Sequence, residues 1–364
     1  MADNAKTEPM VTLERVNTPP AQTWNYLKTN DITLTVPRLS RKGDVYFAIP
    51  RLFDRVETGM GPKVTDWVTS QAADATYVEV RAGEKNHAPV VVDVDSNAGT
   101  VSDTGVMVRH DADATVVVVS HGADDAERTS AALVRIVVEA GAHLRLVEVV
   151  AEGDAHQHLE SVGISADEGA TVDVRQFFLG AGTTAAGICC ALKGDDARID
   201  LQSHYLGQGT QVLDINHVVR MVGKNGRADV RESGILNDAA HKTLRATIDL
   251  VHGARGSKGN EAESVLVLGD DVVNKTMPVI LCDEDDVAGN HGATIGSVSP
   301  EQMAYLADRG LTEADATALF SRAVVDDAYA HATPAARRAI AGCAAAIYGD
   351  DVAEELACEH ATED

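Results

Sequence analysis

The chain has 364 residues, of which 31 are Lys or Arg and 56 are Asp or Glu, so its formal net charge is −25. Nucleic acids and anionic membranes repel so acidic a protein, and we expect neither to be its main ligand. The length suffices for one elongated domain with smaller caps.

The acidity and the cysteines together indicate a cellular setting. Many acidic residues with only 4% aromatic residues are typical of a protein from a high-salt cytoplasm, although ordinary solubility is the alternative explanation. The start of the chain is polar, and no apolar run reaches the ~18 residues that a membrane span needs. An odd number of cysteines then predicts a reduced, cytoplasmic protein; they are Cys189, Cys190, Cys282, Cys343 and Cys358.

Residues 1–74 are expected to form a small N-terminal cap that is partly irregular. Pro19, Pro20 and Pro37 interrupt any long element, because proline restricts its own backbone and that of the preceding residue. Trp24 and Leu27 are three residues apart, which suits one helical turn packed against another element.

Residues 75–297 contain a repeat that predicts the fold class. Short alternating runs such as Val172-Asp173-Val174 follow small turn residues, and a second extended run completes each period. Two strands per period cannot bury their apolar faces alone, but they can when stacked as coils about 4.8 Å apart. The steps are 28, 28, 27, 29 and 28 residues between Ala114, Ala142, Ala170, Ala197, Gly226 and Ala254. We therefore predict a mainly β protein that folds as a right-handed parallel β-helix of about 28 residues per coil. The constant period favours this fold in preference to a β-sandwich.

Residues 298–364 are predicted to form a C-terminal helical domain. Ser299 offers an N-cap hydroxyl, Pro300 suits the first helical position, and Gln302 stands at the capping-box position. Gly310 ends that helix, because glycine adopts the left-handed cap conformation without strain. Further helix starts are expected at Thr312 and at Thr333-Pro334.

Several cysteines and histidines could suggest metal sites, but their spacing favours structural roles. Cys189 and Cys190 are neighbours on a strand and point to opposite faces, so we expect two buried small side chains. Cys343 and Cys358 lack a Cys-x-x-Cys spacing, so an iron–sulfur cluster held by this chain alone is not expected. His156-Gln157-His158 puts two imidazoles on one strand face, but no third ligand is near, and a solvated turn is expected.

The end of the repeat array carries the most specific motifs. Asn290-His291-Gly292-Ala293-Thr294-Ile295-Gly296 leads into a helix that ends Tyr305-Leu306-Ala307-Asp308-Arg309-Gly310. This combination resembles the SufB/SufD family of iron–sulfur cluster assembly scaffolds, and within it SufD, where a Ser-His-Gly-Ala-Thr signature precedes a Tyr-Leu-x-x-Arg-Gly helix end. The segments 265–271 and 275–278 are similar to the family's penultimate coil. The resemblance covers about residues 75–325 and is strongest over 260–315.

The resemblance implies a fold, partners and a site. Family members are flattened right-handed β-helices; SufB and SufD pair through their last coils, and the C-terminal helices hold a SufC ATPase. It implies a non-catalytic scaffold with a transient iron–sulfur cluster at the SufB interface, no cofactor on the lone subunit, and room for a flavin on the complex. His291 becomes the candidate iron or sulfur ligand, since imidazole suits iron, and Cys282 a weaker one. The implied partner-binding residues are Asn290, Thr294, Tyr305, Leu306, Arg309, Leu311, Leu319 and Phe320.

The sequence also departs from the SufB pattern. The sulfur-accepting cysteine of SufB aligns with Glu263, so this chain lacks that thiol, and Asn290-His291-Gly292 replaces the Glu-His-Glu of SufB. Gly289 stands where some SufD proteins have cysteine. Two alternatives remain at this point: a homodimeric scaffold paired through the same edge, and a β-helix enzyme acting on polysaccharides, although such enzymes are usually secreted and rich in aromatic residues.

Overall fold

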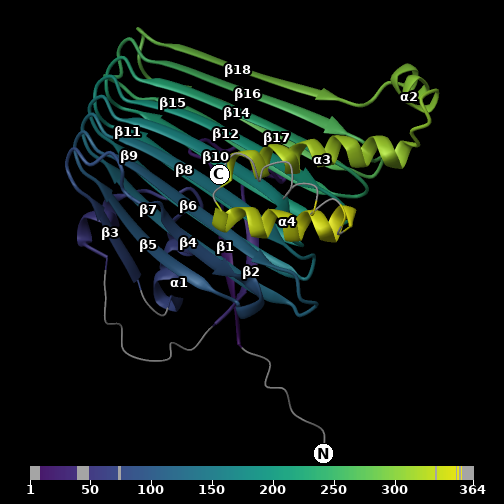
Figure 1. The fold of residues 1–364 in the computed structure, drawn as a ribbon. Coiled ribbons are helices and arrows are strands. Elements are labelled where there is room, and N and C mark those ends of the chain that lie inside the picture. Colours follow the sequence, from purple (N-terminus) through teal and green to yellow (C-terminus); the bar gives the residue numbers. More distant parts are fainter. Residues whose placement is uncertain are drawn as a thin grey trace, which may run out of the picture.

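The computed structural model describes residues 9–38, 49–72, 75–332, 334–349, 351 and 354, so Thr333 and Cys358 lie outside the described residues. Two parallel sheets, each of eight strands, form a rod in which every coil contributes one strand to each sheet (Figure 1). The even sheet contains β4 (Val90–Asp95), β6 (Asp113–Gly122), β8 (His143–Glu152), β10 (Thr171–Gly180), β12 (Arg198–Gly207), β14 (Arg227–Leu236), β16 (Lys258–Val267) and β18 (Ala288–Gly296). The odd sheet contains β3 (Ala75–Val80), β5 (Val101–Val108), β7 (Arg128–Val138), β9 (His156–Ala166), β11 (Thr183–Leu192), β13 (Val212–Met221), β15 (His241–Leu250) and β17 (Val273–Cys282).

The prediction of a mainly β, parallel β-helix is confirmed. β8 begins at His143 and β18 begins at Ala288, five coils later, which averages 29 residues per coil. The repeat is visible in the sequence because each coil makes the same turn: Gly141, Gly169 and Asp196 adopt positive φ, and a small buried residue follows each of them. Two residues of the predicted series do not occupy this turn position. Ala112 takes it in place of Ala114, and Ser257 in place of Ala254, because Asp113 pairs with His143 and Lys258 pairs with Arg227.

A continuous apolar column fills part of the interior of the rod. Alternate residues of each strand point inward, and successive coils place them in register, as with Leu144 on Val172 and Leu146 on Val174. These side chains are fully buried, and each contributes about 1.5–3 kcal/mol relative to exposure.

The N-terminal residues cover the outer face of the odd sheet. An antiparallel hairpin of β1 (Met10–Val16) and β2 (Ile32–Pro37), with α1 (Pro62–Gln71), packs on Leu133, Leu159 and Ala185. Neither the hairpin nor α1 was indicated by the sequence pattern. The short 3-10 helices here and at the second coil are η1 (Asn25–Leu27), η2 (Arg51–Arg55) and η3 (Ser96–Ala98).

One expectation for this region is wrong. The helical turn near Trp24 and Leu27 exists as η1, but its apolar side chains do not pack inward. Trp24 is 73% exposed and Leu27 is 42% exposed. The cap is held instead by residues on either side of that turn.

A buried ion pair fastens the cap to the odd sheet. Arg245 on β15 binds both carboxylate oxygens of Asp214 on β13, at 2.7 and 3.0 Å, and its Nε donates to the Thr29 carbonyl. The Asn17 amide donates to Asp214 Oδ1 at 2.8 Å and to the Ala186 carbonyl at 3.2 Å. The charges are therefore fully paired inside an interface between two segments that are distant in sequence.

In the described part of the chain, three helices follow β18. α2 (Pro300–Ala307) and α3 (Glu313–His331) begin with capping boxes at Ser299 and Thr312, and α4 (Pro334–Tyr348) completes the group. α3 and α4 lie against the even sheet, where Val325 and Ile340 meet a cluster that includes Val149 and Phe177 (Figure 1). None of the described helices is both long and apolar enough to cross a membrane.

Candidate functional site

The last coil, β17 and β18, leaves one end of the rod uncovered. β17 pairs with β15 and β18 pairs with β16, and neither strand has a further partner among the described residues. All nine residues of β18 are exposed. An edge with free backbone N–H and C=O groups can bind another strand or another chain.

The register shows which side chains the last coil presents inward. On β16, Glu261 and Val265 are buried in the rod, and they pair with His291 and Ile295 on β18. Residues paired in register share a face, so His291 and Ile295 occupy interior-facing positions. No further coil of the residues that the structure describes covers them, and Ile295 is 59% exposed.

The candidate residues on the other face of β18 have different surroundings. Asn290 donates from its amide to Asn260 Oδ1 at 3.0 Å, one coil away, and Thr294 pairs with Ser264. Both remain exposed. Their side chains lie on the face of β18 opposite to that of His291.

Cys282 and His291 are not brought together. A Cβ atom on Gly289 would meet Ile280, so Ile280 lies opposite the start of β18. His291 lies two residues farther from the turn that Cys282 begins, and the Cys282 thiol contacts the Glu284 carbonyl at 3.3 Å. Among the residues that the structure describes, no group of three His, Cys, Asp or Glu side chains could hold a metal ion.

A buried ionic cluster lies one coil beneath β18. Glu263 accepts hydrogen bonds from Lys242, from Tyr205 Oη at 2.7 Å and from Thr276 Oγ1 at 2.6 Å. Burial lowers the pKa of Lys242, and the Glu263 carboxylate acts against that shift. Glu263 is therefore a buried carboxylate with three hydrogen-bond partners.

This cluster ends a longer row of polar side chains inside the rod. Glu148, Gln176, Ser203, Glu232 and Glu263 stand in register on successive strands of the even sheet, and all are buried. Burial, and then the neighbouring Glu263, raises the pKa of Glu232 to about 8, and burial raises that of Glu148 well above its ordinary value. The sequence analysis did not predict this row. Aligning the sequences of successive coils with one another would have shown a polar residue at the same position of each.

The expectation for His156-Gln157-His158 is also wrong, because both imidazoles are buried. His156 lies 2.7 Å from Ser96 Oγ and 2.9 Å from Asp124 Oδ1. His158 lies between Glu152 and Glu160, at 3.1 and 2.6 Å. Burial alone would lower the pKa of His158, but the two carboxylates, Glu152 first, raise it to about 10, so this is a structural ion cluster.

The helical candidates form a groove beside the last coil. Tyr305, Leu306 and Phe320 line a hollow of about 650 Å³ together with Leu266 and Val298. Leu319 on α3 is exposed nearby in sequence, and Leu311 is half-buried. The Arg309 guanidinium stacks on the Tyr305 ring, 3.4 Å from its centroid.

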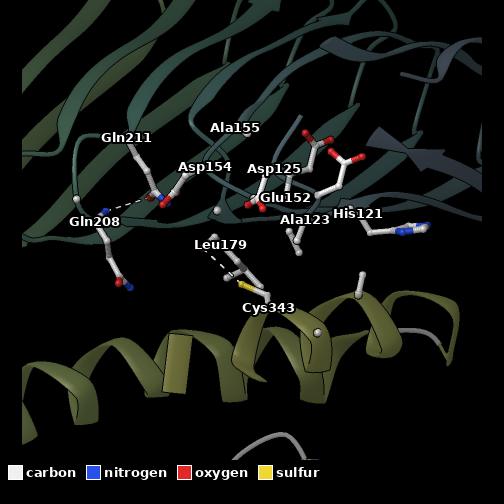
Figure 2. A pocket seen from close by; sticks show the side chains of 18 of the residues that line it. His121, Ala123, Asp125, Glu152, Asp154, Ala155, Leu179, Gln208, Gln211 and Cys343 are labelled. Carbon is white, nitrogen blue, oxygen red and sulfur yellow. Dashed lines mark hydrogen bonds between the residues drawn. The ribbon is translucent and has the colours of Figure 1, made fainter. Parts of the chain in front are cut away.

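A second hollow, of about 690 Å³, lies where α4 meets the turns of the even sheet. Figure 2 shows Cys343 rising from α4 toward Leu179, with Asp125 and Asp154 on the strand side. The Cys343 thiol lies 3.7 Å from the Leu179 carbonyl, and burial raises its pKa to about 12, so it is a poor metal ligand. Cys189 and Cys190 are buried on opposite faces of β11, as expected, and burial raises the pKa of both thiols.

Comparison with known proteins gives one family. Residues 90–324 match the family model described as SUF system FeS cluster assembly, SufBD core domain. The iron-sulfur cluster assembly protein SufD of Escherichia coli is 25% identical over 256 residues, which are 68% of this chain and 60% of that protein. SufD of Bacillus subtilis is 29% identical over 128 residues, which are 35% of this chain and 29% of that protein.

A relative from a third organism gives the same result. An iron-sulfur cluster assembly SufBD family protein of Pyrococcus horikoshii is 28% identical over 133 residues, 36% of this chain and 29% of that protein. The matches span less than two thirds of the length of these relatives. The family model nevertheless covers more than half of this chain. The chain belongs to the SufBD family of iron–sulfur cluster assembly proteins of the SUF system, and it is SufD-like.

Proposed function

We propose that this chain is a non-catalytic scaffold subunit that pairs with a SufB-like subunit through its last coil. The observation that supports it most is the uncovered end of the rod, where His291 and Ile295 occupy interior-facing positions without a covering coil. The iron–sulfur cluster is then transient cargo of the pair. Residues 1–74 serve as a cap, 75–297 as the scaffold core and 298–364 as the helical domain.

His291 is the proposed iron or sulfur ligand of this subunit at the shared interface. Its imidazole is exposed on β18, and imidazole is a suitable iron ligand. Cys282 is the weaker candidate, because it is the last residue of β17 and its thiol contacts a backbone carbonyl. A single ligand cannot hold a cluster, so the remaining ligands come from the partner.

The helical domain is the proposed binding site for a SufC-like ATPase. The groove lined by Tyr305, Leu306 and Phe320 is mostly apolar, and Arg309 stacks on Tyr305. Leu319, which precedes Phe320 in sequence, is exposed. Hydrophobic grooves with aromatic walls are typical of protein docking sites. The proposed complex works in the cytoplasm, and the charge of −25 suits a salt-rich one.

The test is co-expression with the SufB-like and SufC-like proteins of the same organism. We expect a three-component complex, and His291→Ala to lower its iron and sulfide content while leaving assembly intact. The matched control is His110→Ala, an exposed histidine near the opposite end of the rod, which should change neither. A wild-type chain that recovers no partner contradicts the scaffold role, and unchanged cluster content in His291→Ala removes only the ligand role.

The same experiment separates two related outcomes. A lone chain whose mass is that of a dimer, unchanged by the SufB-like protein, would favour self-pairing through the last coil. We expect any flavin on the assembled complex only, which visible absorbance spectra of the complex and the lone subunit will show.

A further inference from the structure

The loop that joins β1 and β2 exposes an aromatic pair. Trp24 is 73% exposed and Tyr26 is 72% exposed, and their rings stack with centroids 5.8 Å apart at an angle of 20°. Leu27 lies beside them in sequence and is also exposed. In a chain with only 4% aromatic residues, a cluster of exposed apolar side chains marks an interaction surface. We call residues 17–31 the hairpin tip.

Contacts along the hairpin show where this tip lies. The Thr35 carbonyl accepts from Gln157 on β9, and Asn17 donates to the Ala186 carbonyl on β11. At the tip, Thr29 accepts from Arg245 on β15 and reaches Met277 Sδ on β17 at 3.7 Å. The hairpin therefore runs across the strands of the odd sheet toward the last coil, and its tip lies over β15 and β17.

The tip is held in one conformation. The buried Asn30 side chain accepts from the Thr23 backbone N–H at 2.7 Å and donates to the Thr23 carbonyl at 2.8 Å and to Asn25 Oδ1 at 3.1 Å. The ion pair of Arg245 and Asp214 fixes the base of the loop. Aromatic side chains on such an ordered loop lose little conformational entropy on binding, which favours affinity.

The charge of the tip distinguishes it from most of the surface. The tip, residues 17–31, has one basic residue, Lys28, and one acidic residue, Asp31, so its formal charge is zero in a chain with a net charge of −25. The strand that ends the even sheet, β18, likewise contains no Asp or Glu. Segments without net negative charge thus occur on both sheets at the same end of the rod.

We propose that Trp24, Tyr26 and Leu27 form a second docking contact for the SufB-like subunit that covers the last coil. The inference rests on the proposed function. A partner coil that continues the odd sheet would lie about 4.8 Å beyond β17, where Thr29 already touches Met277. The partner would therefore meet the tip as it covers the last coil, and stacked aromatic residues are effective interface anchors.

The two tryptophans of the chain give a direct readout. Trp67 is 5% exposed in the cap, whereas Trp24 is on the tip. The chain labelled with 5-fluorotryptophan should show two fluorine resonances. Addition of the unlabelled SufB-like subunit should shift the Trp24 resonance and shield it from solvent, and leave the Trp67 resonance in place.

Variants then test the energetic role. The double variant Trp24→Ala/Tyr26→Ala should keep the thermal stability of the lone chain and weaken binding of the SufB-like subunit by roughly 10-fold or more. The matched control is Tyr77→Ala, a less exposed tyrosine on β3 at the opposite end of the rod, which should leave binding unchanged.

The outcomes separate this inference from the proposed function. If the wild-type chain binds the SufB-like subunit while the Trp24 resonance and the double variant's affinity stay unchanged, the inference is overturned and the scaffold role stands. If the wild-type chain does not bind it at all, both are overturned. A Trp24 shift caused by self-association alone, or by the SufC-like ATPase alone, assigns the tip to another occupant and also overturns the inference.

Discussion

Val265 and Ile295 occupy equivalent positions on neighbouring coils, yet one is 3% exposed and the other 59%. Glu261 and His291 form a second such pair, the first buried and the second exposed. The strands have the same direction, register and side-chain alternation, so only the presence of a following coil differs. An interior coil is stabilised by neighbours on both sides, whereas the last coil presents interior-facing residues to a partner.

The largest difference is expected when a charge is placed at the two equivalent positions. Val265→Asp puts an unpaired carboxylate inside the rod and should lower the free energy of unfolding by about 3–5 kcal/mol. Ile295→Asp should change the stability of the lone chain little, because its side chain is already in water, but should abolish binding to the SufB-like subunit. Urea unfolding and a binding assay measure the two effects.

The control for a charge on the last strand is Thr294→Asp, on the other face of β18. It should affect binding less than Ile295→Asp. If Val265→Asp and Ile295→Asp destabilise the lone chain equally, the last coil is not exposed to solvent in the lone chain.

The buried ion pair of Arg245 and Asp214 lies beneath the N-terminal cap, so breaking it tests how much a covered surface contributes to stability. Arg245→Met leaves the buried Asp214 carboxylate without its guanidinium and should cost about 3–5 kcal/mol in the free energy of unfolding. Adding Asp214→Leu removes the unpaired charge and should restore part of that loss. Urea unfolding of the single and double variants measures this coupling, and equal stability of the two would contradict it.

The interior row should make stability depend on pH. In the folded chain the pKa of Glu232 is about 8, above its value in the unfolded chain, so the folded state retains a proton that the unfolded state releases. Stability therefore falls as pH rises from about 4.5 to about 8, by at most about 1.4 kcal/mol per pH unit for this one group. Glu232→Gln should flatten that slope in urea titrations at several pH values.

His158 contributes with the same sign in a higher range. Its folded pKa is about 10, so the stability it adds is fully present below about pH 6.5 and is lost as pH rises toward 10. Urea unfolding at several pH values between 6.5 and 10 measures this loss. A stability that stays constant over this range would contradict it.

The smallest expected effect concerns the helix that follows the last coil. Ser299→Ala removes a hydroxyl that accepts from the Gln302 N–H at 3.2 Å and should destabilise α2 by about 1 kcal/mol. Hydrogen exchange of the α2 amides should become faster, while exchange in β8 to β14 stays as before. Slower or unchanged exchange in α2 would show that its cap is not needed.

The coils were predictable from the sequence because every coil repeats one local pattern, as at Ala142 and Ala170 after positive-φ glycines. The N-terminal hairpin was not, since it is held by contacts between distant segments, such as those of Asn17 and Thr29 with β11, β13 and β15. The prediction that His158 is solvated was wrong, because the sequence does not distinguish a buried imidazole from a solvated one.

The candidate site was predictable only in part. Its place in the chain followed from the motif around His291, but its geometry depends on where the rod ends. Only the register of β16 and β18 shows that Ile295 and His291 point the same way. Only the packing of the opposite sheet shows that Lys242 is the partner of Glu263.

Hydrogen–deuterium exchange of the chain, alone and with the SufB-like subunit, will show whether the partner covers the last coil. We expect strong protection on binding within residues 273–282 and 288–296, and little change in the strands of the middle coils. Binding that protects the first coil or the middle of either sheet, and leaves β17 and β18 exchanging as in the lone chain, would contradict it.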